Sequence, residues 1–278
     1  MFSEKYGYKE PKVIQYENVS NELRNRVWNL FYQSEIRDGK LAERLSLALN
    51  GGQTIEEKIL DRLGILINSA GKSKTAEEQL KEYVIRHSRW YEVYDFIDIH
   101  LSYLGEDERK IRSKEYNIIL EQEKAGYRVI NAEIAPITNE VEINTIEQAT
   151  DTAFESVNQH IQKALKLYAD IKAPDYENSI KESISAVEAM CCTITGMSGA
   201  NATLGKALKK LKDHGVHIHQ AMESAFLSLY GYTSDEDGIR HGGVDFKSAP
   251  SEDAKYMLIS CSAFVNYLIE KYEKAEAD

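Results

Sequence analysis

Apolar residues recur every three or four positions through most of the chain, and this is the spacing of amphipathic helices. In residues 20–31 the repeat begins behind Ser20 or Asn21, either of which can cap a helix. Thr54 and Glu57 have the spacing of a capping box ahead of the next apolar repeat. The N-terminal half is therefore predicted to be mainly helical.

A long apolar and aromatic stripe follows in residues 76–104. Trp90, Val93, Ile97 and Leu101 lie on it at helical spacing, with further aromatic residues beside them. The stripe predicts one continuous helix whose aromatic side chains belong to the core.

The helical pattern stops at residues 126–137, "GYRVINAEIAPI". Apolar pairs flank the dipeptide Asn131-Ala132 there, which predicts a small β-hairpin. Asn139 then has the capping-box spacing of a helix start. We expect a domain boundary near residue 140.

The remaining chain is predicted to be a bundle of four or five helices. Asp175 is expected to cap one of them, and apolar residues on that helix repeat at 4-3-4-3 spacing, as a narrow seam against one neighbour does. The seam consists of Ile180, Ile184, Val187, Cys191 and Ile194. The other predicted helices cover residues 153–171, a segment that ends at Gly215, 218–230 and 251–274. The fold class is thus mostly α: an N-terminal helical domain with a small β-hairpin in residues 1–140, followed by a helical bundle in residues 141–278.

Composition fits a globular chain, since 42% of the 278 residues are hydrophobic, 28% are charged and only four are proline. The sequence has neither an apolar run of membrane-spanning length nor the pattern of a signal peptide. Three cysteines do not make a disulfide framework and fit a reducing compartment. We therefore expect a cytoplasmic protein without a membrane partner.

The formal net charge of −11 repels polyphosphate at long range, so a nucleic-acid partner needs a local basic face. One exists in "GKALKKLKDH", where Lys206, Lys209 and Lys210 lie opposite the apolar positions of a short helix. Two interpretations remain open for these lysines. They form either an ordinary solvated helix face or a face that contacts phosphate.

A metal site is a weaker hypothesis. His214, His217 and His219 are close enough in sequence to ligate zinc, but no cysteine or carboxylate completes an evident set of four ligands. We expect an interhelical loop there, with no metal and no cofactor.

The segment "SDEDGIRHGG" carries the most suggestive chemistry. Arg240 can hold a phosphate through its fork of donors, and His241 can transfer a proton near neutral pH. Asp237 can orient or tune the imidazole if a helical turn begins there. A polar turn between two helices explains the same residues, and from the residues alone it is the favoured interpretation.

Two resemblances extend this interpretation. The segments "FSEKYGYKEPKVIQYENVSNELRNRVWN", "WYEVYDFIDI" and "GYRVINAEIAPIT" resemble, in the same order, the N-terminal domain of AbiJ-type abortive-infection proteins. These are bacterial anti-phage proteins, and the resemblance covers most of residues 1–140. It implies a role in defence, although the trigger is not readable from the sequence.

The C-terminal half resembles a HEPN domain in "DYENSIKESISAVEAMCCTITG", "LGKALKKLKDHG" and "LYGYTSDEDGIRHGG". That superfamily implies a helical bundle, often a homodimer, with an Arg and a His forming a metal-independent RNase site. In the superfamily four to six residues separate the pair, whereas Arg240 and His241 are adjacent, as AbiJ-like members often show. The resemblance gives Arg240 the phosphate-binding role and His241 the acid–base role.

The polar partner that this resemblance implies on the second bundle helix is Glu182, with Ser185 and Glu188 nearby. The alternative for these three is an exposed helix face. Together the resemblances imply an anti-phage effector that cleaves RNA through its 2′-hydroxyl. Two alternatives stay open: a HEPN-like module that binds RNA, nucleotide or a protein without cleavage, and a purely structural dimerisation module.

Overall fold

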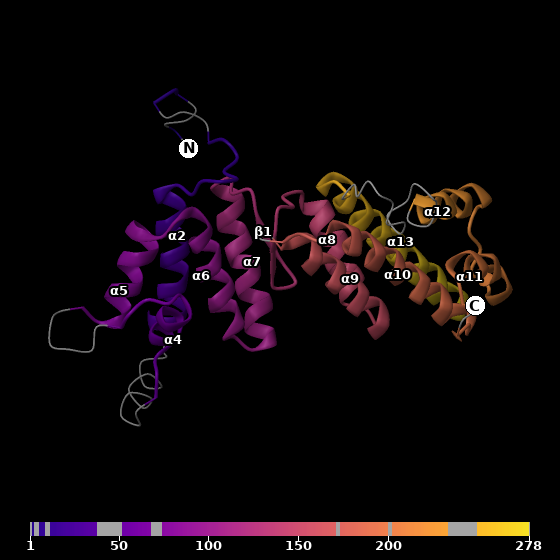
Figure 1. Ribbon diagram of the computed structural model, residues 1–278, viewed down its shortest axis with the longest axis horizontal. Coiled ribbons are helices and arrows are strands. Elements are labelled where there is room, and N and C mark those ends of the chain that lie inside the picture. The colour runs from indigo at the N-terminus through magenta and orange to yellow at the C-terminus, as the bar shows by residue number, and fades with distance from the viewer. Residues whose placement is uncertain are drawn as a thin grey trace, which may run out of the picture. The chain divides into compact units, whose positions relative to one another are not determined.

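The computed structural model describes residues 2, 6–8, 12–37, 52–67, 74–170, 173–199, 202–232 and 249–277. Within these residues the chain is mostly helical, with one two-stranded antiparallel sheet, so the predicted mostly-α class is confirmed (Figure 1). The chain forms two compact units, Met1–Thr138 and Asn139–Asp278, and each is described by itself.

The first unit contains helices, two π-helical turns and the hairpin. In chain order these are α2 (Asn21–Phe31), η1 (Tyr32–Arg37), α4 (Ile55–Arg62), α5 (Ala76–Glu82), η2 (Tyr83–His87), α6 (Trp90–Ser102), α7 (Glu106–Gln122), β1 (Arg128–Ile130) and β2 (Glu133–Ala135). The second unit contains α8 (Glu140–Thr150), α9 (Glu155–Ala169), α10 (Tyr176–Thr195), α11 (Leu204–Lys210), the 3₁₀ turn η4 (Leu211–His214), α12 (Gln220–Tyr232) and α13 (Ser251–Ala277).

Several helices begin at the capping residues that the sequence predicts. The Ser20 side chain caps α2, Thr54 and Glu57 form the reciprocal capping box of α4, and Asp175 caps α10. Asn139 also caps α8, but only half of the predicted box is present there. Glu142 forms an ion pair with Lys255 of α13 in its place, at 2.7 Å.

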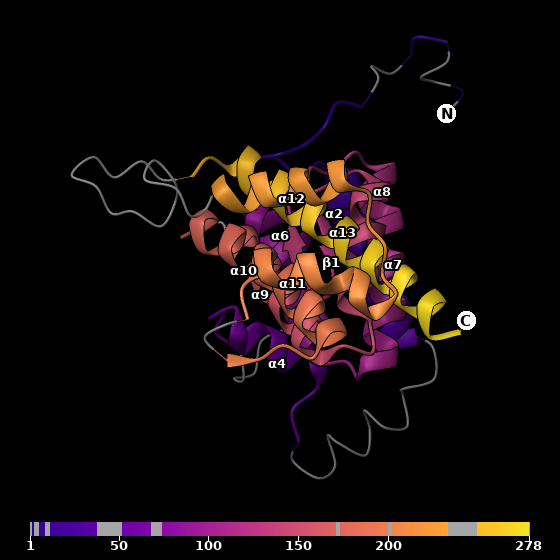
Figure 2. The ribbon, with the colours of Figure 1, turned by 90° about the vertical axis from the view of Figure 1, so that its right-hand side faces the viewer.

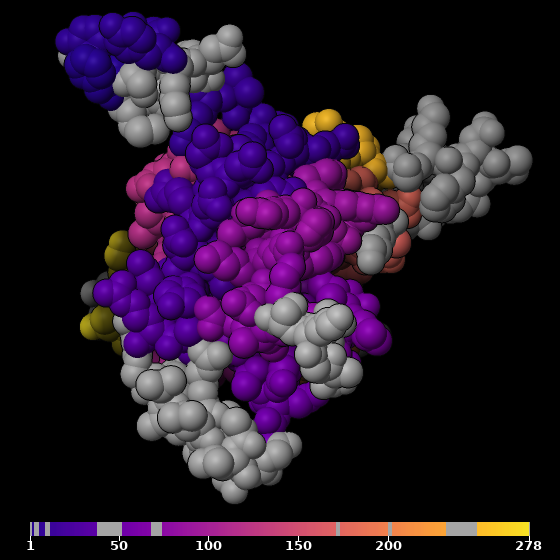
Figure 3. Space-filling model, turned by 90° about the vertical axis from the view of Figure 1, so that its left-hand side faces the viewer, coloured from indigo at the N-terminus to yellow at the C-terminus, as the bar shows by residue number. Residues whose placement is uncertain are grey.

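The core of the first unit lies between α2, α6 and α7, and its buried residues there include Leu23, Phe31, Phe96, Ile97, Tyr116 and Leu120. The rings of Phe31 and Phe96 meet edge to face at 5.1 Å. Figure 3 shows the indigo surface of residues 12–37 beside the purple and magenta surface of the helices that follow. The predicted core role of the aromatic stripe is confirmed for Tyr94 and Phe96, whereas the Tyr91 side chain remains 37% exposed.

The prediction of one continuous helix over residues 76–104 is wrong. The chain forms α5, widens into η2, passes through extended backbone at Ser88 and Arg89, and starts again as α6. Arg24 of α2 donates to the Val84 carbonyl at 3.0 Å and to the Ser88 hydroxyl, which fixes the break from outside the segment. The apolar period continues across the break, so periodicity alone could not reveal it.

The predicted hairpin is confirmed, with Val129 paired to Ile134 in the middle of its register. Asn131 and Ala132 both have positive φ, of 47° and 65°, as a two-residue turn of the hairpin type requires. Gly126 lies before β1, against the backbone of Gln15. A side chain there would clash, because an added Cβ would be 2.8 Å from the Gln15 carbonyl oxygen.

In the second unit α10 packs between α9 and α13, and α13 runs across the whole unit (Figures 1 and 2). All five residues of the predicted seam are buried. The buried face is wider than one seam, because α10 packs against α9, α13 and α11 rather than against a single helix. Ser179 and Ser183 are also fully buried, and the Ser179 hydroxyl donates to the Ala164 carbonyl of α9 at 2.8 Å. In the part of the chain that the structure describes, no helix has an apolar stretch long enough to cross a membrane.

Candidate functional site

A cluster of three polar side chains, His160, Lys163 and Glu182, joins α9 to α10. His160 and Lys163 are three residues apart on α9 and therefore share one face of that helix. His160 Nδ1 lies 2.6 Å from one carboxylate oxygen of Glu182, and Lys163 Nζ lies 2.5 Å from the other. The Glu182 side chain is only 16% exposed, whereas those of His160 and Lys163 are 36% and 63% exposed. Solvent or a ligand can thus reach the side chains of His160 and Lys163, whereas the carboxylate of Glu182 is mostly covered.

Glu182 is ionised at neutral pH for a structural reason. Its partial burial by itself would raise the pKa of the carboxyl group, but the hydrogen bonds from Lys163 and His160 outweigh burial and hold that pKa below its ordinary value. The carboxylate therefore acts as a permanent hydrogen-bond acceptor for both partners.

A hollow of about 330 Å³ opens beside this cluster. His160 lines it from α9, and residues spaced along one face of α10 line it from the other side. The lining residues are His160, Ser185, Glu188, Ala189, Cys192, Met197, Ser198 and Ala202. The Ser185 hydroxyl donates to the Lys181 carbonyl at 2.8 Å, which leaves its oxygen free to accept.

The structure brings together three of the site residues that the HEPN resemblance implies. Ser185 and Glu188 line the hollow, and Glu182 binds the histidine that lines it with them. Sequence reasoning missed His160 and Lys163. Their only signal is a polar pair on the solvent side of the amphipathic segment "NQHIQKALKL", which many surface helices also carry.

The three lysines lie where their spacing predicts. Lys206, Lys209 and Lys210 are exposed on α11, and Leu204 and Leu208 on the opposite side of that helix are buried. The lysines do not line the hollow, although the segment that leads into α11 contributes Ala202 to its rim.

Arg240, His241 and Asp237 lie outside the described residues, between the end of α12 at Tyr232 and Ala249. Their proposed roles therefore rest on the sequence alone.

Among the described residues no group of three or more His, Cys, Asp or Glu side chains is arranged to hold a metal ion. Cys191 and Cys261 are buried free thiols, and burial raises the pKa of Cys261 to about 12. Cys192 lines the hollow, but burial raises its thiol pKa as well, which disfavours the reactive thiolate.

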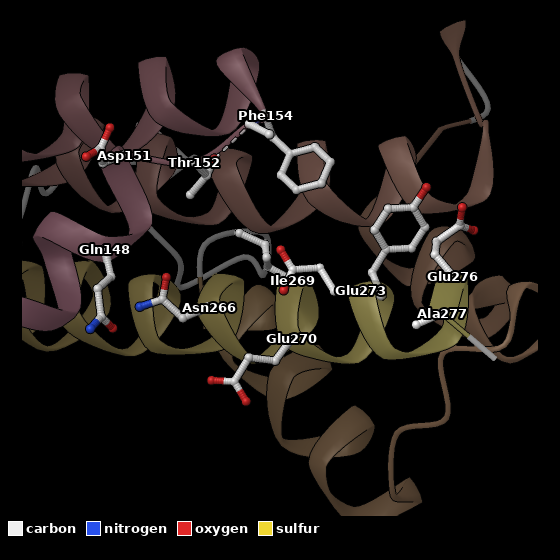
Figure 4. A pocket seen from close by; sticks show the side chains of 12 residues that line it. Gln148, Asp151, Thr152, Phe154, Asn266, Ile269, Glu270, Glu273, Glu276 and Ala277 are labelled. Carbon is white, nitrogen blue, oxygen red and sulfur yellow. Dashed lines mark hydrogen bonds between the residues drawn. The ribbon is translucent and has the colours of Figure 1, made fainter.

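A larger hollow, of about 650 Å³, lies elsewhere on the second unit. Its lining comes from the end of α8, the connection to α9 and the C-terminal part of α13 (Figure 4). Four of its lining residues are acidic, namely Asp151, Glu270, Glu273 and Glu276, and no lysine or arginine is among the described residues that line it. Its four carboxylates disfavour an anion, whereas Glu188 is the one acidic residue among the described residues that line the smaller hollow.

The cluster around Glu182 predicts a pH dependence of stability. Because the pKa of folded Glu182 is below the ordinary value of 4.5, its ion pairs stabilise the folded protein above that pH. This contribution is lost as the pH falls through the folded pKa. Glu182→Gln lacks it at every pH, so the variant is expected to be less stable than the wild type above about pH 5 and to approach it at lower pH. Urea unfolding at a series of pH values measures the difference.

Glu270→Gln on α13, where the carboxylate is exposed, is the matched control and is expected to follow the wild type at every pH. A Glu182→Gln variant with the same stability as the wild type from neutral to acidic pH would contradict the ion-pair account.

The geometry can support proton transfer. A partly exposed imidazole with a carboxylate on one nitrogen is a common arrangement for a general acid or base. Ser185 and Glu188 add acceptors for hydroxyl or amino groups, and Lys163 adds positive charge next to the carboxylate. The arrangement fits a polar substrate whose reaction moves a proton.

Residues 1–152 match the protein-family model described as AbiJ N-terminal domain 4. The match spans the first unit and continues through α8, which packs within the second unit. No significant match was found among curated proteins or among solved structures. Because the family model covers more than half of the chain, the protein belongs to the AbiJ N-terminal domain 4 family, a family of the abortive-infection type.

Proposed function

We propose that this protein is an anti-phage abortive-infection effector whose second unit, a HEPN-like bundle, cleaves RNA in the cytoplasm without a metal ion. The observation that carries the proposal is the ionised Glu182 held by His160 beside a polar hollow. Glu182 is the position that the HEPN resemblance assigns to the polar partner on the second bundle helix. Membership in the AbiJ family supports the defence role.

In the proposed reaction the 2′-hydroxyl of one nucleotide attacks the neighbouring phosphorus, and the bond to the 5′-oxygen of the next nucleotide breaks. Arg240 stabilises the negative charge that develops on the phosphate, and His241 transfers a proton. Asp237 orients the imidazole of His241. The exposed lysines of α11 bind the phosphates of flanking nucleotides.

Within the hollow, Ser185 and Glu188 bind the ribose or the base rather than the phosphate. Both present acceptors, and the negative charge of Glu188 disfavours a phosphate beside it. The proposal includes a homodimer, because the resemblance implies that paired bundles form the site.

The second candidate is a HEPN-like module that binds RNA, nucleotide or a protein partner without cleaving. It is favoured by the absence of spacing between Arg240 and His241 and by the net charge of −11. The structural dimerisation module is a third candidate, and it needs only the apolar helix faces.

The experiment that separates the candidates is incubation of total cellular RNA with the wild type and with His241→Ala, in the presence of EDTA. Fragmentation by the wild type alone supports the metal-independent RNase and assigns His241 to it. Intact RNA in both reactions, together with phage protection that persists in both strains, would favour the binding module. Loss of protection in Arg240→Ala at unchanged stability and oligomeric state would eliminate the dimerisation module.

A further inference from the structure

The side of the hollow formed by α10 presents hydrogen-bond acceptors. Ser185, Glu188 and Cys192 follow one another along one face of that helix, three and four residues apart. Because the Ser185 hydroxyl donates its hydrogen to the Lys181 carbonyl, its oxygen can only accept from a ligand. Burial and, after it, the Glu188 carboxylate raise the pKa of the Cys192 thiol, so that carboxylate lies on the Cys192 side of the hollow.

His160 adds an acceptor from α9. An ionised carboxylate can only accept hydrogen bonds, so the contact at 2.6 Å requires the proton on Nδ1 to point at Glu182. In the neutral ring the other nitrogen, Nε2, then carries a lone pair and no proton. The side chain is partly exposed and lines the hollow, so a ligand can reach it. Side chains from two helices therefore offer acceptors to the same hollow.

The remaining lining is mostly apolar and includes two sulfur atoms. Ala189, Cys192, Met197 and Ala202 contribute methyl groups, a thiol and a thioether. Sulfur atoms of this kind make favourable contacts with aromatic rings. The volume of about 330 Å³ is near the lower end of the range for ligand pockets, about 300–1,000 Å³, and fits one ring system. Ser198 is exposed at the rim, where its hydroxyl can donate to a ring nitrogen.

This lining selects the polar edge of a ring. An amino group supplies the hydrogens that the acceptors need, as the exocyclic amino groups of adenine and cytosine do. A carbonyl oxygen in the same place would face Glu188 and Ser185 with no hydrogen between them, which leaves desolvated acceptors without a partner. An anion is disfavoured for the same reason and by the charge of Glu188.

We propose that the hollow between His160 and α10 binds a planar heteroaromatic ring through its exocyclic amino group. The amino group donates to Glu188 and to a second acceptor, Ser185 or His160, and the ring lies against Cys192 and Met197. Adenine and cytosine are rings of this class, whereas hypoxanthine and uracil carry a carbonyl in place of the amino group. In the proposed RNase the ring is a base of the RNA, and this part of the inference rests on the proposed function.

The first test measures the binding of free nucleosides to the full chain in two matched pairs, adenosine with inosine and cytidine with uridine. Within each pair the amino-bearing member is expected to bind about tenfold tighter or more. Amide NMR signals of Ser185, Glu188 and Cys192 are expected to shift on titration. Butylamine, an amine without a ring, is expected to bind more weakly than either amino-bearing nucleoside.

Three results would overturn the inference. The first is a lack of binding by adenosine and cytidine up to about 10 mM, or shifts confined to helices away from the hollow. The second is an affinity for inosine or uridine within about threefold of its partner's. The third is butylamine binding as tightly as the nucleosides, because the site would then recognise an amine alone.

The second test changes the acceptor. Glutamine at position 188 presents an amino donor as well as an acceptor, so Glu188→Gln is expected to reduce the preference for cytidine over uridine to less than about threefold. Glu177→Gln is the matched control, because Glu177 lies in the first turn of α10 and does not line the hollow. It is expected to keep the wild-type preference. Thermal unfolding checks that both variants are folded, and an undiminished preference in folded Glu188→Gln contradicts the assignment.

Competition by RNA separates a free ligand from a base within a strand. If the ring belongs to RNA, oligocytidylate displaces labelled cytidine and oligouridylate does so at least about tenfold less well. Equal displacement by the two strands would overturn the RNA part of the inference. A protein that binds cytidine selectively but leaves every RNA intact refutes the RNase and keeps the binding site. A protein that cleaves RNA but does not distinguish cytidine from uridine refutes this inference alone.

Discussion

Replacement of Glu182 by alanine is expected to lower the rate of RNA cleavage about 100-fold or more, while the protein remains folded. The carboxylate receives hydrogen bonds from both His160 and Lys163. Without it His160 and Lys163 lose their shared acceptor, and the imidazole beside the hollow is free to rotate. Initial rates on an oligoribonucleotide, measured at saturating substrate, report this loss.

Glu270→Ala is the matched control for Glu182→Ala, because it removes one negative charge from an exposed position of the same unit. Its rate is expected to equal that of the wild type. Glu182→Gln tests the charge separately, since glutamine keeps an oxygen acceptor but can also present its amino group to the ring. Equal rates for the wild type and Glu182→Ala would show that this cluster is a surface ion pair and not part of a site.

A Val187→Asp variant is expected to unfold the second unit. Val187 is 1% exposed on the face of α10 that packs inside the bundle. The variant loses the burial of an apolar side chain and places a carboxylate without a partner in the core, which together cost more than about 4 kcal/mol. This is comparable with the whole stability of a typical domain, about 5–15 kcal/mol. Circular dichroism is expected to show a large loss of helix, and limited proteolysis a resistant fragment from the first unit.

Thr193→Asp adds the same charge to the same helix at an exposed position. It is expected to cost less than about 1 kcal/mol, mainly from the negative charge near the C-terminal end of α10. Proteolysis of Val187→Asp that matches the wild-type pattern would contradict the assignment of this face to the core.

Local signals in the sequence account for most of the secondary structure. The capping residues Ser20, Thr54 and Asp175 begin the helices that they predict, and Asn131 lies in the predicted hairpin turn. The interruption between α5 and α6 was not predictable in this way. It depends on Arg24, which comes from a different helix and binds the backbone at the break, so the signal is tertiary.

The same difference between local and tertiary signals separates the residues of the candidate site. Glu182, Ser185 and Glu188 lie three residues apart on one helix, so a resemblance to a known bundle could suggest all three. His160 lies on the preceding helix, and only the packing of α9 against α10 brings it to Glu182. Arg240 and His241 remain predictions from the sequence, since they lie outside the described residues.

The central claim is that the protein cleaves RNA through a 2′-hydroxyl, and a pair of matched oligonucleotides tests it most directly. One is entirely ribonucleotide, and the other has a single 2′-deoxy sugar at the position where the first is cut. The account predicts cleavage of the first in EDTA with a 2′,3′-cyclic phosphate end, and no cleavage of the second at that position. Cleavage of the deoxy-substituted strand at the same bond would contradict it, because that product requires another nucleophile.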